Sequence, residues 1–261
     1  MSHSSRRPIS ASSTITGSLI EETYLIFQDW NFSESKTKNL SRVRETNPIG
    51  AGSSSWLYYI TKTLSRRFEP NHQDKVLVQL AQDECDREVW KPILLWHITR
   101  RDFLLRDFLS QWLYQQYLEG MYRLRTTDVI PYVKNLSYRK DVSLPRPWSP
   151  KTITKVSSSL LRIAVDFGLM KGKLNREFIP YYLPDTSFLY LLHAMTESEP
   201  NAQRMIKSPD WQIYRMDVAQ VERELLRLHQ FHQLSYEVAG SLSQIQLPCK
   251  SSEDYARRLV A

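Results

Sequence analysis

The 261-residue chain contains few cysteines and few glycines: two of the former and seven of the latter. Cys85 and Cys249 lie far apart and match no metal-ligand spacing, so the sequence excludes a disulfide framework and fits a reducing compartment. A chain of this length with little glycine and abundant Leu, Gln, Arg and Trp favours a mainly α-helical, globular protein.

Long hydrophobic runs are also missing. The longest, residues 93–96 and 188–192, fall far short of the ~20 residues needed to span a bilayer. The first residues, MSHSSRRPISASST, are polar and lack the apolar core of a signal peptide. We therefore predict a flexible N-terminal tail over residues 1–16, no membrane segment and a cytoplasmic location.

Motifs that carry catalysis are equally scarce. The sequence contains no GxxxxGK[ST] loop, no GxGxxG and no HExxH. His229 and His232 have a spacing that suits a metal, but no third ligand lies near them. The acids between positions 83 and 88 are typical of a solvated helix face more than of a nuclease metal site. We expect a non-catalytic protein without a metal, a cofactor or a small-molecule substrate.

The segment from Trp148 to Tyr182 is the most informative part of the chain. Ser149 is a good helix N-cap and Pro150 suits the first helical position. Apolar residues then recur at steps of three and four, and Gly168 follows as a helix-ending residue: the apolar positions are Ile153, Val156, Leu160, Ala164 and Phe167. We predict an amphipathic helix that ends at Gly168.

A basic hairpin is predicted directly after this helix, with Lys171-Gly172-Lys173 at its turn. Helix, tight stop and hairpin form the second half of a winged helix-turn-helix, in which the helix enters a DNA major groove and the wing contacts phosphate. We assign phosphate contacts to Lys151, Lys155, Arg162, Lys171, Lys173 and Arg176. Approach to base edges is assigned to Thr152, Thr154 and Ser158.

Positive charge is concentrated around this segment. Residues 121–182 hold twelve Lys or Arg against four Asp or Glu, a local net charge of +8, whereas the whole chain carries +7. Such a patch attracts polyanions over about a Debye length, roughly 8 Å at physiological salt. The alternative is an ordinary amphipathic helix and hairpin whose solvated face is basic.

A second, weaker helix-turn-helix-like pattern covers residues 17–70. A helix from Gly17 to Trp30 precedes a basic segment, residues 33–47, and a Ser-capped helix from Ser53 to Phe68. No wing follows, so a plain helical bundle explains the pattern equally well. Candidate DNA contacts here are Arg42, Arg44, Lys62, Arg66 and Arg67. If both units bind one duplex, their basic faces should be co-facial or about one DNA turn apart, ~34 Å. Otherwise Arg66 and Arg67 cap helix ends or pair with acids of the middle segment, such as Glu84 or Glu88.

The remaining chain divides by composition. Residues 71–120 form an aromatic-rich helical core, interrupted near Pro92. Residues 121–195 form the winged-helix-like unit, whose two helices are joined by a long loop over residues 137–148. Residues 196–261 form a C-terminal helix and hairpin region, with a polar connector at 200–211. The fold class is therefore mainly α, with winged helix-turn-helix-like units and short β-hairpins.

Three segments together resemble a known family: TGSLIEETYLIFQDW, SSSWLYYITKTLSRRFE and WSPKTITKVSSSLLRIAVDFGLM. Their order, the aromatic-rich helices between them and the chain length are similar to the BrxA family of the bacterial BREX bacteriophage-exclusion systems. The resemblance covers most of residues 16–195. It implies a mainly helical, cytosolic, DNA-binding protein without an assigned catalytic activity. It also implies work alongside other BREX components, which include a DNA methyltransferase and ATPases.

Two functions follow from these patterns. The first is a non-catalytic accessory component of phage defence that binds double-stranded DNA largely through phosphates. The second is a winged-helix protein-interaction scaffold within the defence complex that does not bind DNA, since a fold does not fix a function.

Overall fold

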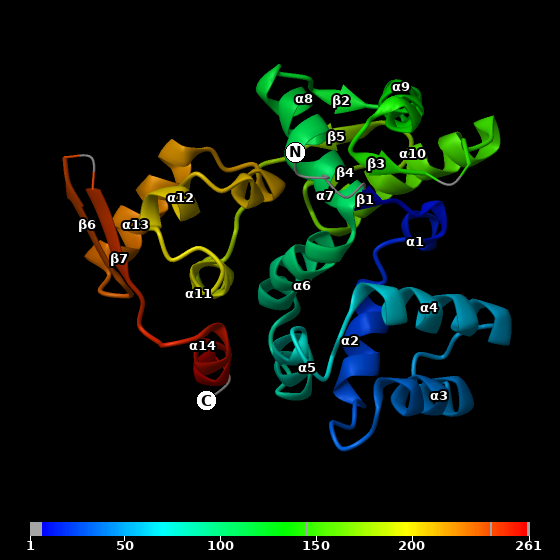
Figure 1. The fold of residues 1–261 in the computed structure, drawn as a ribbon, viewed down its shortest axis with the longest axis horizontal. Helices are drawn as coiled ribbons and strands as arrows, with labels where there is room; N and C mark the ends of the chain where they lie inside the picture. The colour runs from blue at the N-terminus through cyan, green and yellow to red at the C-terminus, as the bar shows by residue number, and fades with distance from the viewer. Residues whose placement is uncertain (1–6, 145, 241, 260–261) are drawn as a thin grey trace.

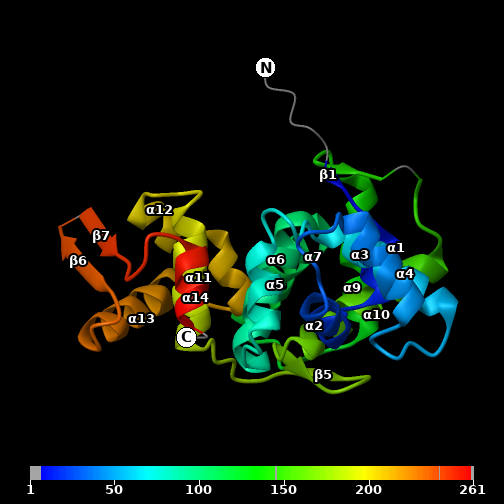
Figure 2. The same cartoon turned by 90° about the horizontal axis from the view of Figure 1, so that it is seen from below.

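The computed structural model describes residues 7–144, 146–240 and 242–259 of the chain. It is mainly helical with a few short strands, as the composition predicts. The C-terminal elements lie at one end of an elongated molecule, the N-terminal helices lie at the other, and the central helices run between them (Figures 1 and 2).

The N-terminal part begins with elements that the sequence does not predict. It consists of β1 (Arg7–Pro8), α1 (Ala11–Thr16), α2 (Ile20–Gln28), α3 (Lys36–Thr46) and α4 (Ser54–Arg67). Residues 7–16 were expected to belong to a flexible tail, but they form β1 and α1, because Ile9, Ser13 and Thr14 are buried. The rest of that predicted tail, residues 1–6, lies outside the described residues.

The central helices carry most of the aromatic core. They are α5 (Lys75–Gln82), α6 (Arg87–Arg101), α7 (Phe103–Asp107), the π-helix η1 (Phe108–Leu113) and α8 (Tyr114–Leu118). Trp90 and Phe108 are fully buried, as expected for core aromatics. The expected break near Pro92 is absent: α6 continues through Pro92, which lies in its second turn, where a proline removes few intrahelical hydrogen bonds.

Residues 123–178 form a compact unit of helices around a small sheet. Its elements are β2 (Arg123–Leu124), α9 (Thr126–Asn135), the 3-10 helix η2 (Leu136–Tyr138), β3 (Val142–Ser143), α10 (Pro150–Asp166), β4 (Met170–Lys171) and β5 (Arg176–Phe178). The sheet order is β2-β5-β4, with both pairs antiparallel. In addition, β1 pairs with β3 in parallel. Strand β1 is therefore held against the connection between α9 and α10.

The C-terminal part packs on the central helices through α11 and α14. Its elements are α11 (Asp185–Thr196), α12 (Ala202–Ile206), the 3-10 helix η3 (Pro209–Tyr214), α13 (Val218–Gln230), β6 (Ser235–Ala239), β7 (Leu242–Gln246) and α14 (Ser252–Leu259). The predicted hairpin is confirmed as antiparallel β6 and β7. The expected polar connector is instead partly helical, because Met205, Ile206 and Trp211 are buried.

Helix α1 connects the two units in which DNA contacts were predicted. It packs against both α4 and α10. The Arg66 Nη1 donates to Ser12 Oγ at 3.2 Å, and the Arg162 Nη2 donates to the Ile15 carbonyl at 3.2 Å. The two units are therefore held side by side through α1 (Figure 1).

Candidate nucleic-acid interface

Helix α10 begins and ends as its sequence predicts. The Ser149 Oγ accepts a hydrogen bond from the Thr152 backbone N–H at 3.2 Å, and Pro150 occupies the first turn. Gly168 follows the helix with a φ of +74°, a conformation that strains any residue with a Cβ. Local signals therefore determine where this 17-residue helix starts and stops.

Two neighbouring helices cover most of α10 and restrict what it presents to solvent. α9 packs on one side and α1 on another. As a result Ser157 and Ser159 are buried together with the apolar stripe. Arg162 is exposed, but its guanidinium contacts α1. The surface of α10 open to a ligand is therefore mainly its N-terminal half.

This N-terminal half contains several of the predicted DNA-binding residues. Lys151, Thr154 and Lys155 are exposed, and Thr152 and Ser158 are half-buried. The Thr154 hydroxyl donates to the Pro150 carbonyl at 3.0 Å. Because backbone N–H groups at a helix N-terminus carry partial positive charge, they add to the attraction of the two lysines for an anion.

The wing lies next to this helix in sequence and carries two further exposed lysines. Lys171 and Lys173 flank Gly172 at the turn, and the Lys171 Nζ lies 3.8 Å from the Glu177 carboxylate. The Arg125 Nε donates to Asn175 Oδ1 at 2.7 Å, which ties the start of α9 to the wing. No local pattern in the sequence indicates this role of Arg125, because its contact arises from the pairing of β2 with β5, about fifty residues later in the chain.

Gly172 is required for the wing turn. Its φ is +101°, and a Cβ at this position would lie 2.2 Å from the Asn175 carbonyl oxygen. We expect Gly172→Ala to destabilise the protein by about 1–3 kcal/mol through local strain. Thermal denaturation measures this cost. Gly50→Ala is the matched control, because its φ of +63° is also positive but nothing lies within 4 Å of its Cβ. An equal loss in both variants would contradict a specific clash at the wing.

Arg176 does not belong to the surface, and this corrects its assignment as a phosphate contact. Its side chain is only 7% exposed, and its Nη1 donates to Thr126 Oγ1 at 3.2 Å. Burial lowers the pKa of Arg176, and the nearby Arg162 adds to this effect. Arg176 therefore joins β5 to the start of α9 inside the unit.

Two of the five candidate DNA contacts in the N-terminal unit, Arg67 and Arg42, are instead engaged in contacts within the protein. Arg67 is 2% exposed and donates to three backbone carbonyls around the end of α1. Arg42 is half-buried and pairs with Asp29 and Glu34. These contacts correct both assignments: the two guanidinium groups hold the N-terminal helices together. Neither Glu84 nor Glu88 is their partner.

The other three N-terminal candidates remain on the surface. Arg44, Lys62 and Arg66 are exposed. Arg44 is oriented by its Nε, which donates to Thr61 Oγ1 at 2.8 Å. All three lie on or beside α4, which α1 separates from α10.

The charge excess of residues 121–182 is largely solvent-accessible. Of its twelve basic side chains, Arg176 is buried and Arg139 is half-buried between Asp107 and Asp141, while the other ten are exposed. The counted charge is therefore also a surface charge, which is the property that attracts a polyanion.

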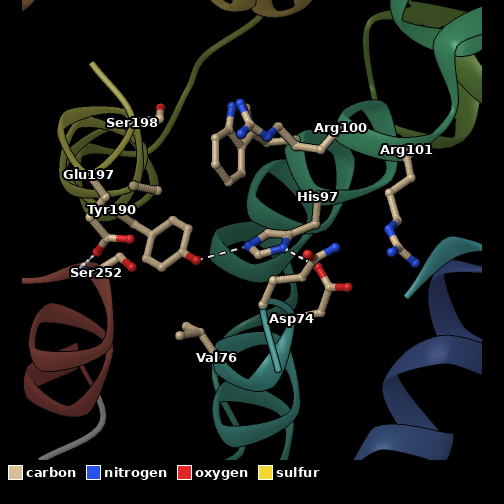
Figure 3. A pocket seen from close by; sticks show the side chains of 12 residues that line it. Asp74, Val76, His97, Arg100, Arg101, Tyr190, Glu197, Ser198 and Ser252 are labelled. Carbon is tan, nitrogen blue, oxygen red and sulfur yellow. Dashed lines mark hydrogen bonds and ion pairs between the residues drawn. The ribbon is translucent and has the colours of Figure 1, made fainter. Parts of the chain in front are cut away.

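A separate cavity of about 450 Å³ lies between the central helices and the C-terminal part. Among the residues that line it, the His97 Nδ1 lies 2.6 Å from Asp74 Oδ1, and the His97 Nε2 lies 2.9 Å from the Tyr190 hydroxyl (Figure 3). Since a carboxylate only accepts, Nδ1 donates to Asp74 and Nε2 accepts from the hydroxyl. Both ring nitrogens are thus occupied, and the group joins the start of α5 to α6 and α11.

Members of the histidine pair and of the acid cluster at positions 83–88 also make contacts within the protein. The His229 Nδ1 accepts from the Tyr236 backbone N–H at 3.2 Å, Asp86 caps α6, and Glu88 pairs with Lys91. Within residues 7–144, 146–240 and 242–259, no group of three or more His, Cys, Asp or Glu side chains is arranged to hold a metal ion. Over the same residues, none of the helices has the length and apolar character that a bilayer crossing requires.

Comparison with known protein families finds a match over most of the chain. The model of the BrxA family matches residues 8–194, which is more than two thirds of the chain. The matched region runs from β1 into α11 and so includes both units described above. No curated protein and no solved structure matches the chain.

Proposed function

The chain belongs to the BrxA family, which is associated with BREX phage-exclusion systems, and on this premise we propose that it is a non-catalytic, cytoplasmic component that binds double-stranded DNA. In this proposal α10 and the wing contact the duplex, mostly at phosphates. The other BREX components are its protein partners.

The order of elements in residues 123–178 supports a winged-helix interpretation. A strand, two helices and a β-hairpin follow one another, and the first strand joins the hairpin in the order β2-β5-β4. In this arrangement α10 takes the place of the recognition helix, and residues 171–175 take the place of the wing. The connection between α9 and α10, which contains η2 and β3, is longer than the usual tight turn.

The observation that carries the proposal is the exposed N-terminal half of α10. Lys151 and Lys155 are exposed, and among the described residues neither makes an ion pair with a carboxylate. Recognition helices contact DNA through their N-terminal residues. The part of α10 that α1 and α9 leave uncovered is therefore the part such a helix uses.

Sequence preference is expected to be weak. The exposed polar residues of this half are lysines and a threonine, and the bidentate Arg, Asn or Gln contacts that distinguish bases are lacking there. Phosphate contacts fix position without reading sequence.

A salt titration tests the proposal. We expect a fluorescent duplex of arbitrary sequence to bind at low salt, with log affinity falling against log salt at a slope of about −3 to −4 if four phosphates are neutralised. Fluorescence anisotropy measures both quantities. A duplex that fails to bind at about 50 mM salt would rule the proposal out.

One observation favours the scaffold as a second candidate. Leu174, at the tip of the wing, is 84% exposed. An apolar wing tip suits a protein surface better than phosphate, and exposed apolar groups often mark protein contacts. Reversing the charges of Lys151 and Lys155 and measuring both duplex binding and co-purification separates the two candidates.

A further inference from the structure

The outward face of α4 combines exposed aromatic rings with positive charge. Trp56 is 40% exposed, Tyr58 46% and Tyr59 53%. The helix contains no acidic residue, and Lys62 and Arg66 are exposed farther along it. Rings of this size are usually buried, so three exposed in one helix mark a surface that folding alone does not require.

The core side of α4 explains which residues the fold does require. Leu57, Ile60 and Leu64 are buried and pack into the hydrophobic core. Trp56 and Tyr59 lie outside this core and are three positions apart, so they are neighbours on one helical face. Within the part of the chain that the structure describes, neither side chain makes a hydrogen bond. These two rings are therefore available to a ligand.

Cations are arranged beside the Tyr58 ring, which adjoins Tyr59: the centroids of these two rings lie 5.9 Å apart. The Arg44 Cζ lies 5.3 Å and the Lys62 Nζ lies 5.4 Å from the centroid of the Tyr58 ring. The hydrogen bond from Arg44 to Thr61 holds its guanidinium in this position. Positive side chains next to exposed rings reproduce the two components of a single-strand binding surface, which are base stacking and phosphate attraction.

We propose that this face of α4, the α4 platform (Trp56, Tyr59, Lys62 and Arg44), binds single-stranded DNA by stacking unpaired bases on Trp56 and Tyr59. Lys62 and Arg44 contact the neighbouring phosphates. Bases in a duplex are already stacked and cannot meet the ring faces, so the α4 platform is specific for unpaired nucleotides. This site is distinct from α10 and adds a second substrate form to the proposed duplex binding.

The test uses the full chain and fluorescein-labelled oligo(dT) of about 16 nucleotides, titrated by anisotropy at low salt. Trp56→Ala combined with Tyr59→Ala is expected to weaken oligo(dT) binding by about tenfold or more, because each stacked base contributes an appreciable part of the affinity. Trp56→Phe keeps a ring and should retain most of the affinity. Tyr122→Ala removes an exposed tyrosine elsewhere and should change nothing.

The same variants separate this proposal from duplex binding through α10. The aromatic double variant should keep wild-type affinity for duplex, while Lys151→Glu with Lys155→Glu should keep oligo(dT) binding. The absence of oligo(dT) binding in the wild type would overturn the α4 platform, as would unchanged binding in the aromatic double variant. The proposal would also be overturned if the wild type binds poly-glutamate and not oligo(dT), and the aromatic double variant loses the poly-glutamate binding. This result would identify the face as a site for an acidic protein.

Discussion

Lys151→Glu combined with Lys155→Glu is expected to weaken duplex binding by about a hundredfold at low salt and to flatten the salt slope by about two units. Each substitution removes one phosphate contact and places a negative charge near the backbone of the duplex. Both positions are exposed on the uncovered half of α10, so the fold should tolerate the change. Anisotropy titrations of one duplex at several salt concentrations measure both effects.

A matched variant controls for the altered net charge. Lys207→Glu with Lys250→Glu reverses two exposed lysines in the C-terminal part. It should change the overall charge equally and leave the slope nearly unaltered, because neither residue lies in the unit of residues 123–178. Equal losses in the two double variants would show that affinity follows net charge alone and would contradict a site on α10.

The same α10 variant separates the DNA-binding and scaffold candidates. If the protein binds DNA, duplex affinity falls while co-purification with other BREX components persists. If the unit is a scaffold, the wild type already has negligible duplex affinity, and the charge reversal reduces co-purification. The two candidates predict different results for duplex affinity and for co-purification. The experiment therefore distinguishes them even though both functions use the same fold.

The elements that could be predicted from sequence are those set by neighbouring residues. Ser149 and Gly168 delimit α10 through a hydrogen bond and a backbone conformation that involve only adjacent positions. Ser53 caps α4 in the same way. The hairpin of β6 and β7 follows from alternation around Gly240. In each case the required interaction is complete within a few residues, so it is visible in the sequence.

The elements that could not be predicted depend on distant partners. The β2 strand is two residues long and exists because β5 pairs with it about fifty positions later. Helix α1 has six residues, too few to be stable alone, and forms because it packs between α4 and α10. This packing also removes the C-terminal half of α10 from the candidate surface, which the periodicity of that helix does not reveal.

The distribution of charge along the sequence indicates the basic region but does not distinguish exposed side chains from buried ones. Arg66 and Arg67 are adjacent, yet one is exposed and the other is buried. The sequence pattern assigns Arg176 and Lys173 alike to phosphate contacts, but Arg176 is buried and Lys173 is exposed. A helix turns by about 100° per residue, so neighbouring arginines face different surroundings. If Arg66 and Arg67 both contacted phosphate, replacing them with Ala would flatten the salt slope by up to about two units. Because Arg67 is buried, at most Arg66 contributes.

Arg67→Ala is expected to cause the largest loss of stability among these substitutions. The Arg67 guanidinium donates to the carbonyls of Ser18 at 3.0 Å, Ser13 at 3.0 Å and Gly17 at 2.7 Å. Its removal leaves these carbonyls without their donor inside the protein, a cost of about 3–5 kcal/mol. For a chain of this size that corresponds to a fall in Tm of roughly 10 °C.

Arg66→Ala provides the control, because the residue is the exposed neighbour and makes one hydrogen bond to Ser12. Its Tm should stay within about 1–2 °C of wild type, since exposed interactions contribute little. Because Arg67 is buried, its loss should leave the salt slope of duplex binding unchanged at temperatures where the variant is folded. Arg67 holds α1 against α4 and so fixes the two basic units side by side. A folded Arg67→Ala variant with wild-type Tm and a flatter salt slope would contradict this structural role and would show that Arg67 contacts DNA.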